Sequence, residues 1–148
     1  VVAELAAYYR SRGLTLADGI EEIYKEYGYY AEKTISVTLS GVDGAEQIKA
    51  IMAKFRNNAP KEWNATEITV VEDFKAQTST AADGTVTALT TPPSDVLKYT
   101  LADGSWIAVR PSGTEPKIKF YIAVVGESNE DAQAKIANIE AEINVFVK

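Results

Sequence analysis

The chain has 148 residues, no histidine, no cysteine and a formal net charge of -6, which suits a single compact domain without disulfides or a cysteine zinc site. Without histidine, the commonest general base and metal ligand, any chemistry must come from hydroxyls, amines, guanidinium groups or carboxylates. The acidic balance, with a pI near 4.7, argues against nucleic-acid binding, and no apolar run is long enough to cross a membrane, so we expect a cytoplasmic protein.

Two helical patterns open the chain. Apolar residues recur at helical spacing over residues 1–9, and Gly13 supplies the stop. Thr15 and Asp18, three residues apart, predict the start of a second helix. An apolar stripe then continues at helical spacing to Gly28. Its members are Leu16, Ile20, Ile23, Tyr24 and Tyr27.

The first helix begins at residue 1 with neither a methionine nor a capping residue before it. A helix that starts in this way is typical of a chain cut from something larger. We therefore expect residues 1–28 to be a short helical connector, with a separate folded unit after it.

A strand and a helix are predicted next. Residues 34–39 alternate between polar and apolar side chains, the pattern of a half-buried strand. Asp43 with Glu46 predicts the cap of a helix that ends at residues 57–60. The inner face of this helix is expected to carry Ile48, Ile51, Met52 and Phe55.

A period of two returns after this helix. We expect Ile68, Val70 and Glu72 to share one face of a strand. Residues 75–94 are poor in large apolar side chains and contain an Asp-Gly turn signal and a Pro-Pro pair. This stretch predicts a weak hairpin or a loop.

The last third of the chain gives the clearest signals. Residues 96–101 and 106–110 flank an Asp-Gly turn and predict a hairpin. Residues 118–124 alternate again, and Ser128 with Asp131 starts a final helix. The apolar face of that helix carries Ala132, Ile136, Ile139 and Ile143.

Beyond residue 28 the predicted order is therefore β-α-β-β-β-β-α. Consecutive hairpins favour a mostly antiparallel sheet, and two amphipathic helices should cover one of its faces. The expected fold class is α+β, with two layers.

The segment RPSGTEPK at residues 110–117 has a composition suited to an anion. Arg110 offers a rigid guanidinium fork that matches paired phosphate oxygens. Ser112 and Thr114 add hydroxyl donors. Gly113 is expected to adopt a backbone conformation that a side chain would forbid, which turns N–H groups toward one point.

The charges of this segment also favour an anion. Arg110, Lys117 and Lys119 oppose only Glu115, which leaves +2 in an acidic protein. Glu115 does not fit a bare phosphate cradle: it could point away, accept loop N–H bonds, or hold a cation or a sugar hydroxyl. A plain turn is the competing interpretation, because Ser, Gly, Thr and Pro are ordinary turn formers.

Residues 110–117, with the lead-in DGSWIAV at 103–109, resemble the C-terminal phosphate-binding signature of the α-D-phosphohexomutases, the phosphoglucomutase and phosphomannomutase enzymes. Residues 15–30 resemble the stretch that joins their third domain to the fourth, and the likeness leans toward the bacterial phosphoglucomutases. The resemblance implies a TATA-binding-protein-like β-α-β4-α fold for a C-terminal phosphate-binding domain at 29–148. Fold likeness alone does not imply DNA binding.

The resemblance also implies a function within a longer enzyme that interconverts glucose 1-phosphate and glucose 6-phosphate, or mannose phosphates. In that family Mg²⁺ and hexose 1,6-bisphosphate take part, and other domains carry the phosphoserine, metal and sugar-reading motifs, none of which occurs here. This chain would hold the phosphate that is not reacting, with no catalytic and no metal-binding residue of its own. The implied ligands are Arg110, Ser112, Gly113, Thr114 and Lys117.

We therefore expect a hexose phosphate substrate, upstream domains of the same polypeptide as partners, and no activity from this chain alone. The alternative is a non-catalytic interaction or regulatory module that binds anions.

Overall fold

The computed structural model describes the backbone of residues 1–148 and the side chains of all of them except Tyr24. The helices are α1 (Val2–Ser11), α2 (Leu16–Tyr27), α3 (Gly44–Asn57) and α4 (Asn129–Val147). The strands are β1 (Tyr29–Thr38), β2 (Glu62–Trp63), β3 (Thr66–Asp73), β4 (Thr78–Ala81), β5 (Val86–Ala88), β6 (Leu97–Leu101), β7 (Trp106–Pro111) and β8 (Lys117–Gly126).

The strands make one antiparallel sheet in the order β1-β8-β7-β6-β3-β4-β5, with β2 paired to β3 beside this path. The mixture of helices with an antiparallel sheet confirms the predicted α+β class. Among the described residues, no helix combines the length and the apolar character needed to span a bilayer.

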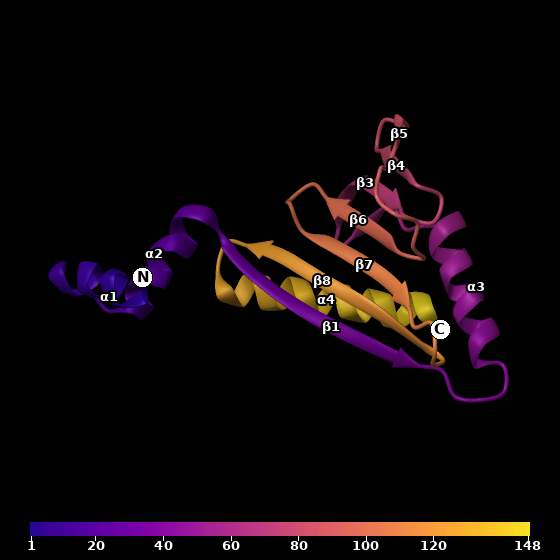
Figure 1. Cartoon of the computed structure of the whole chain (residues 1–148), viewed down its shortest axis with the longest axis horizontal. Helices are drawn as coiled ribbons and strands as arrows, with labels where there is room; N and C mark the ends of the chain where they lie inside the picture. The colour runs from indigo at the N-terminus through magenta and orange to yellow at the C-terminus, as the bar shows by residue number, and fades with distance from the viewer.

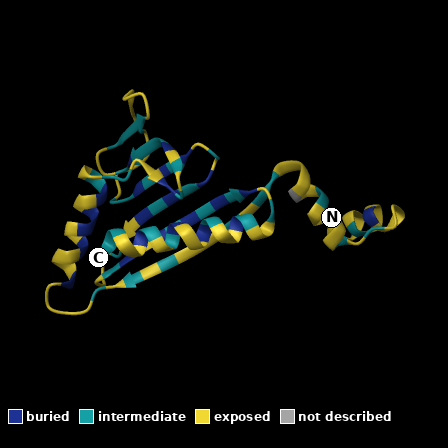
Figure 2. Ribbon diagram, turned by 180° about the vertical axis from the view of Figure 1, so that it is seen from behind, coloured by how far each residue is buried: buried dark blue, intermediate teal, exposed yellow. Residues whose placement is uncertain are grey.

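α3 and α4 pack on the same face of the sheet. α4 lies along β1 and β8, while α3 crosses one end of the strands (Figure 1). The Phe55 ring of α3 lies 4.4 Å from that of Phe146 in α4 and 5.6 Å from that of Phe120 in β8, centroid to centroid. The hydroxyl of Tyr99 in β6 donates a hydrogen bond to the Phe55 carbonyl at 2.8 Å. Both helices therefore share one core, and Figure 2 shows their outward faces exposed.

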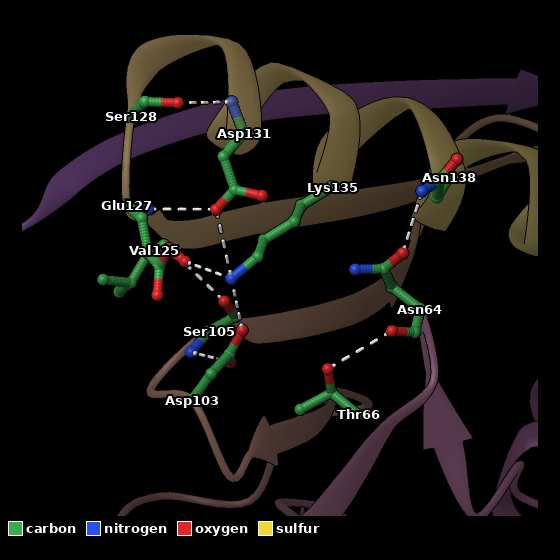
Figure 3. Close-up of polar contacts among 10 residues, drawn as sticks. All are labelled: Asn64, Thr66, Asp103, Ser105, Val125, Glu127, Ser128, Asp131, Lys135 and Asn138. Carbon is green, nitrogen blue, oxygen red and sulfur yellow. Dashed lines mark hydrogen bonds and ion pairs between the residues drawn. The ribbon is translucent and has the colours of Figure 1, made fainter.

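The start and the buried face of α4 are as predicted. The Ser128 hydroxyl accepts from the Asp131 N–H at 3.0 Å, and the Asp131 carboxylate accepts from the Glu127 N–H at 3.0 Å (Figure 3). The first bond satisfies an N–H group that the first helical turn leaves without a partner, and the second fixes the residue that precedes the cap. The residues predicted for the inner face are buried: Ala132, Ile136, Ile139 and Ile143.

α1 and α2 lie apart from the sheet, beyond the end of β1 where Tyr29 begins (Figure 1). The predicted ends of α2 are confirmed, because Thr15 and Asp18 exchange hydrogen bonds at its start and Gly28, just after its end, has a φ of +96°. The predicted stripe is largely exposed, with Ile20 at 51% and Tyr27 at 65%. The side chain of Tyr24, which also belongs to that stripe, lies outside the described residues.

β3 departs from the predicted alternation. Opposite β6 the register shifts between Ile68 and Val70, so that the residue between them is extra. Such a bulge moves the following side chains to the other face. Ile68 and Asp73 are accordingly buried and Val71 packs on the core. The prediction that Ile68, Val70 and Glu72 share one face is therefore wrong.

The start of α3 also differs from the prediction. Asp43 stands at the N-cap, but its side chain makes no capping hydrogen bond. Glu46 instead accepts from the Lys49 ammonium at 2.8 Å on the helix surface. The predicted Asp43–Glu46 cap is therefore wrong, although the inner face is buried as expected, with Ile48, Ile51, Met52 and Phe55.

The hairpins follow the turn signals. The Asp-Gly turn within residues 75–94 joins β4 to β5, with Gly84 at a φ of +86°. The second Asp-Gly turn joins β6 to β7, with Gly104 at +87°. In both turns glycine supplies a left-handed conformation that is unfavourable for other residues.

Candidate functional site

The loop between β7 and β8 is closed by its own hydrogen bonds. The Ser112 N–H donates to the Lys117 carbonyl at 2.8 Å, and the Lys117 N–H donates to the Glu115 carbonyl at 2.7 Å. The Ser112 hydroxyl oxygen accepts from the N–H groups of Glu115 at 3.3 Å and Thr114 at 3.5 Å. Because that oxygen serves as acceptor inside the loop, its proton remains available to a ligand outside.

Gly113 does not behave as predicted. Its φ lies outside the left-handed region where Gly13, Gly28 and other glycines of this chain lie, so a side chain would be allowed there. A Cβ built on Gly113 would meet nothing within 4 Å. The expectation of a forbidden backbone conformation is therefore wrong. The missing side chain instead leaves open space over the loop.

The loop is fixed to its neighbours on the side away from this space. The Pro116 carbonyl accepts from the Leu39 N–H, just beyond β1, at 2.9 Å. Gly44 lies so close that a Cβ there would be 2.9 Å from the Pro116 Cβ and 2.7 Å from the Leu39 carbonyl oxygen. The end of β1 and the start of α3 thus hold the loop in place.

A hollow of about 300 Å³ opens where the loop meets the outer face of β7 and β8. Four of the five predicted ligands lie in its wall, together with three further residues. The complete lining is Arg110, Pro111, Ser112, Gly113, Thr114, Lys119 and Tyr121. The structure therefore brings most of the predicted group together around one space.

The hollow contains two cations without ion pairs. Arg110 and Lys119 are register partners across the antiparallel β7–β8 ladder. Directly opposite residues on paired strands project from the same face, so both side chains border the hollow. Within the described part of the chain, neither has a carboxylate within 4.0 Å. Lys119 was not among the predicted ligands, and the strand register is the signal that identifies it.

Lys117, the fifth predicted ligand, does not line the hollow. Its ammonium pairs with the Glu115 carboxylate at 2.9 Å. Of the roles left open for Glu115, the structure thus shows one, which is to hold a cation of the same loop.

A second hollow of about 560 Å³ lies on the other side of the loop, against α3. Its wall includes the apolar side chains of Val42, Ile48 and Met52. Its charged residues have partners, because Lys49 pairs with Glu46 and Asp95 pairs with Arg56 at 2.8 Å. The smaller hollow, with two unpaired cations, is therefore the one suited to an anion.

The far end of the sheet carries a polar cluster that is satisfied within itself (Figure 3). The Lys135 ammonium donates to the Asp103 carboxylate at 3.1 Å and to the Val125 carbonyl at 2.8 Å. Burial raises the pKa of Asp103, but hydrogen bonds from the Ser105 N–H and from Lys135 outweigh it, and the net pKa is lowered. This cluster ties the β6–β7 turn to α4.

The described residues contain no cluster of the usual metal-binding side chains. No three histidine, cysteine, aspartate or glutamate side chains among them are grouped so that they could hold a metal ion.

Comparisons with known proteins agree on one family. A family model described as "Phosphoglucomutase/phosphomannomutase, C-terminal domain" matches residues 37–144. The chain is 36% identical over 137 residues to a phosphoglucomutase of Staphylococcus aureus (strain bovine RF122 / ET3-1), covering 92% of this chain and 25% of the relative. It is 33% identical over 139 residues to the phosphoglucomutase of Staphylococcus haemolyticus (strain JCSC1435), covering 93% and 25%.

A solved structure supports the fold. The pp63/parafusin phosphoglucomutase of Paramecium, in its open form, matches with a TM-score of 0.50 and 14% identity, covering 90% of this chain and 22% of that one. The chain thus spans about a quarter of the length of the relatives it matches.

Proposed function

The chain belongs to the phosphoglucomutase/phosphomannomutase C-terminal domain family, and on that premise we propose that it holds a phosphate group of a hexose phosphate within a longer phosphohexomutase. The observation that carries this proposal is the hollow in which Arg110 and Lys119 face the Ser112–Thr114 loop segment. The substrate is the 1-phosphate or 6-phosphate of glucose or mannose, and the phosphate held by this chain is the one that does not react.

The groups around the hollow match a phosphate monoester. At neutral pH such a group carries about 1.5 to 2 negative charges, which the two cations balance. The Arg110 fork suits two phosphate oxygens at once. The hydroxyls of Ser112 and Thr114 donate to the remaining oxygens.

Holding a phosphate away from the reacting centre has a catalytic use. The remote group fixes the position of the sugar, so that its binding energy is converted into orientation at the other end. Rigid attachment of the loop to Leu39 and Gly44 serves this purpose, since a mobile loop would allow the reacting end to move.

The same proposal assigns a role to each part of the chain and to the other domains of the enzyme. Residues 1–28 act as the connector to a preceding domain, and residues 29–148 are the phosphate-binding domain. We assign the latter a TATA-binding-protein-like β-α-β4-α order, supported by the sequence β1-α3-β3-β6-β7-β8-α4 when β2 and the β4–β5 hairpin are set aside. The phosphoserine lies in another domain, Mg²⁺ and hexose 1,6-bisphosphate take part in the full-length enzyme, and this chain alone binds neither and has no mutase activity.

Titration of the chain with glucose 1-phosphate, followed by the backbone amide resonances, tests the proposal. Shifts should concentrate in residues 110–121. Arg110→Ala should weaken binding about tenfold or more, the value of one or two charge-assisted hydrogen bonds. The control Arg10→Ala removes an exposed arginine of α1 and should leave the affinity unchanged. Shifts spread evenly over the chain, or equal effects of the two variants, would contradict the proposal.

A further inference from the structure

We propose that Glu115 sets the charge preference of the phosphate site: it pairs with Lys117, keeps a third cation out of the hollow, and so selects a dianionic phosphate monoester over more highly charged anions. This inference rests on the proposed function and concerns the same site. It makes Glu115 a specificity-determining residue that acts through Lys117, without contact to the ligand.

The geometry places Lys117 within reach of the hollow. In β8, Ile118 and Phe120 are buried, so Lys117 and Lys119 project from the opposite, outer face. Residues two apart along a strand are separated by about 7 Å. The flexible four-carbon stem of lysine covers such a distance. Lys117 would therefore join Arg110 and Lys119 if nothing held it.

Glu115 is the group that holds it. The carboxylate lies 2.9 Å from the Lys117 ammonium, and the backbones of the two residues are joined by the Lys117 N–H to Glu115 carbonyl bond at 2.7 Å. Proline at the centre of this short turn fixes its own φ near the value that such a turn needs. The Pro116 carbonyl is bonded to the Leu39 N–H, so the pair is presented by a rigid backbone.

The number of free cations then determines which anion fits. With Lys117 paired, Arg110 and Lys119 supply two positive charges, which equal the charge of a phosphate monoester dianion. With Lys117 released, three cations would surround the hollow. A more highly charged anion such as pyrophosphate would gain more from the third cation than a monoester, because the Coulomb energy grows with the product of the charges.

A double-mutant cycle tests this inference. The dissociation constants of inorganic phosphate and pyrophosphate are measured at pH 8, where both are highly ionised, for the wild-type chain, Glu115→Gln, Lys117→Gln and the double variant. Glu115→Gln should strengthen pyrophosphate binding about tenfold, the value of one added charge-assisted hydrogen bond. It should strengthen phosphate binding less than about threefold. In the Lys117→Gln background the same change should leave the ratio of the two constants within about twofold of wild type.

Two results would overturn the inference. If Glu115→Gln strengthens both anions equally, Glu115 does not set the charge preference of the site. If the altered preference persists in the double variant, it does not act through Lys117. A wild-type chain that binds neither anion at residues 110–121 would instead refute the proposed function, and this inference with it. The amide spectrum of each variant shows that the fold is intact.

Discussion

Replacing Gly44, the first residue of α3, with alanine tests whether the β7–β8 loop is held in place by its neighbours. A Cβ at this position would lie 2.7 Å from the Leu39 carbonyl oxygen and 2.9 Å from the Pro116 Cβ. Because real Cβ contacts are longer, Gly44→Ala must move α3, the end of β1, or Pro116. The Pro116 carbonyl is bonded to the Leu39 N–H, so any of these movements is transmitted to the loop.

The size of the effect follows from these distances. An ordinary contact of about 3.5 Å requires a displacement of roughly 0.8 Å at the Leu39 carbonyl. Inserting a methyl group into a packed site costs about 1–3 kcal/mol, and the better helix propensity of alanine returns up to about 1 kcal/mol. We expect the unfolding free energy to fall by about 1–2 kcal/mol and Tm by about 3–6 °C. Phosphate affinity should fall about tenfold, because the loop is displaced.

Thermal unfolding followed by circular dichroism and the phosphate titration measure the two effects. Gly113→Ala is the matched control for the unfolding measurement, because a Cβ there meets nothing within 4 Å and the backbone conformation is allowed. Its unfolding free energy should stay within about 0.5 kcal/mol of wild type. If Gly44→Ala unfolds and binds phosphate like the wild-type chain, the junction does not position the loop and the reasoning fails.

Three further variants test the polar contacts that stabilise the fold. Burial raises the pKa of Asp73, but hydrogen bonds led by the one from Arg56 outweigh this effect, and the net pKa is lowered. The ionised Asp73 therefore stabilises the fold above about pH 4, and this stabilisation is lost as the pH falls. Asp73→Asn should lower the unfolding free energy, measured with urea at pH 7, by about 1–3 kcal/mol and flatten its acid dependence; an unchanged profile would contradict this. Tyr99→Phe leaves the Phe55 carbonyl without its donor and should lower the unfolding free energy in urea by about 1 kcal/mol. Burial raises the pKa of Tyr99, so the wild-type chain should lose this stabilisation as the pH rises above about 10, whereas the variant should not show this loss. Ser128→Ala removes the cap of α4 and should cost about 1 kcal/mol, measured in the same way against Ser128→Thr.

Elements whose form depends on neighbouring residues were predictable from the sequence. The β6–β7 hairpin follows from an Asp-Gly pair, because Gly104 takes the left-handed conformation that the turn needs. α4 follows from the Ser128–Asp131 spacing and its periodic apolar face. In both cases the determining contacts lie within a few residues along the chain.

Elements whose form depends on distant residues were not predictable. The bulge in β3 exists only relative to β6, since the residue between Ile68 and Val70 has no partner there. The two-residue strand that ends at Trp63 is too short for any periodicity, although this side chain is 1% exposed and belongs to the core. Its ring stacks on that of Phe55, at the end of α3, and also contacts the tilted ring of Phe146, which lies far from it in the chain.

The candidate site shows how the register of the β7–β8 hairpin determines a local property. Alternation alone places both Lys117 and Lys119 on the outer face of β8, and it does not say which one faces Arg110. The Ser112 N–H to Lys117 carbonyl bond closes the loop so that Arg110 pairs with Lys119. If the loop were two residues shorter in register, Lys117 would lie opposite Arg110 and would lose its ion pair with Glu115. The closure of this loop therefore determines which cation borders the hollow and which is paired beside it, and the family resemblance that implied Lys117 does not contain this register.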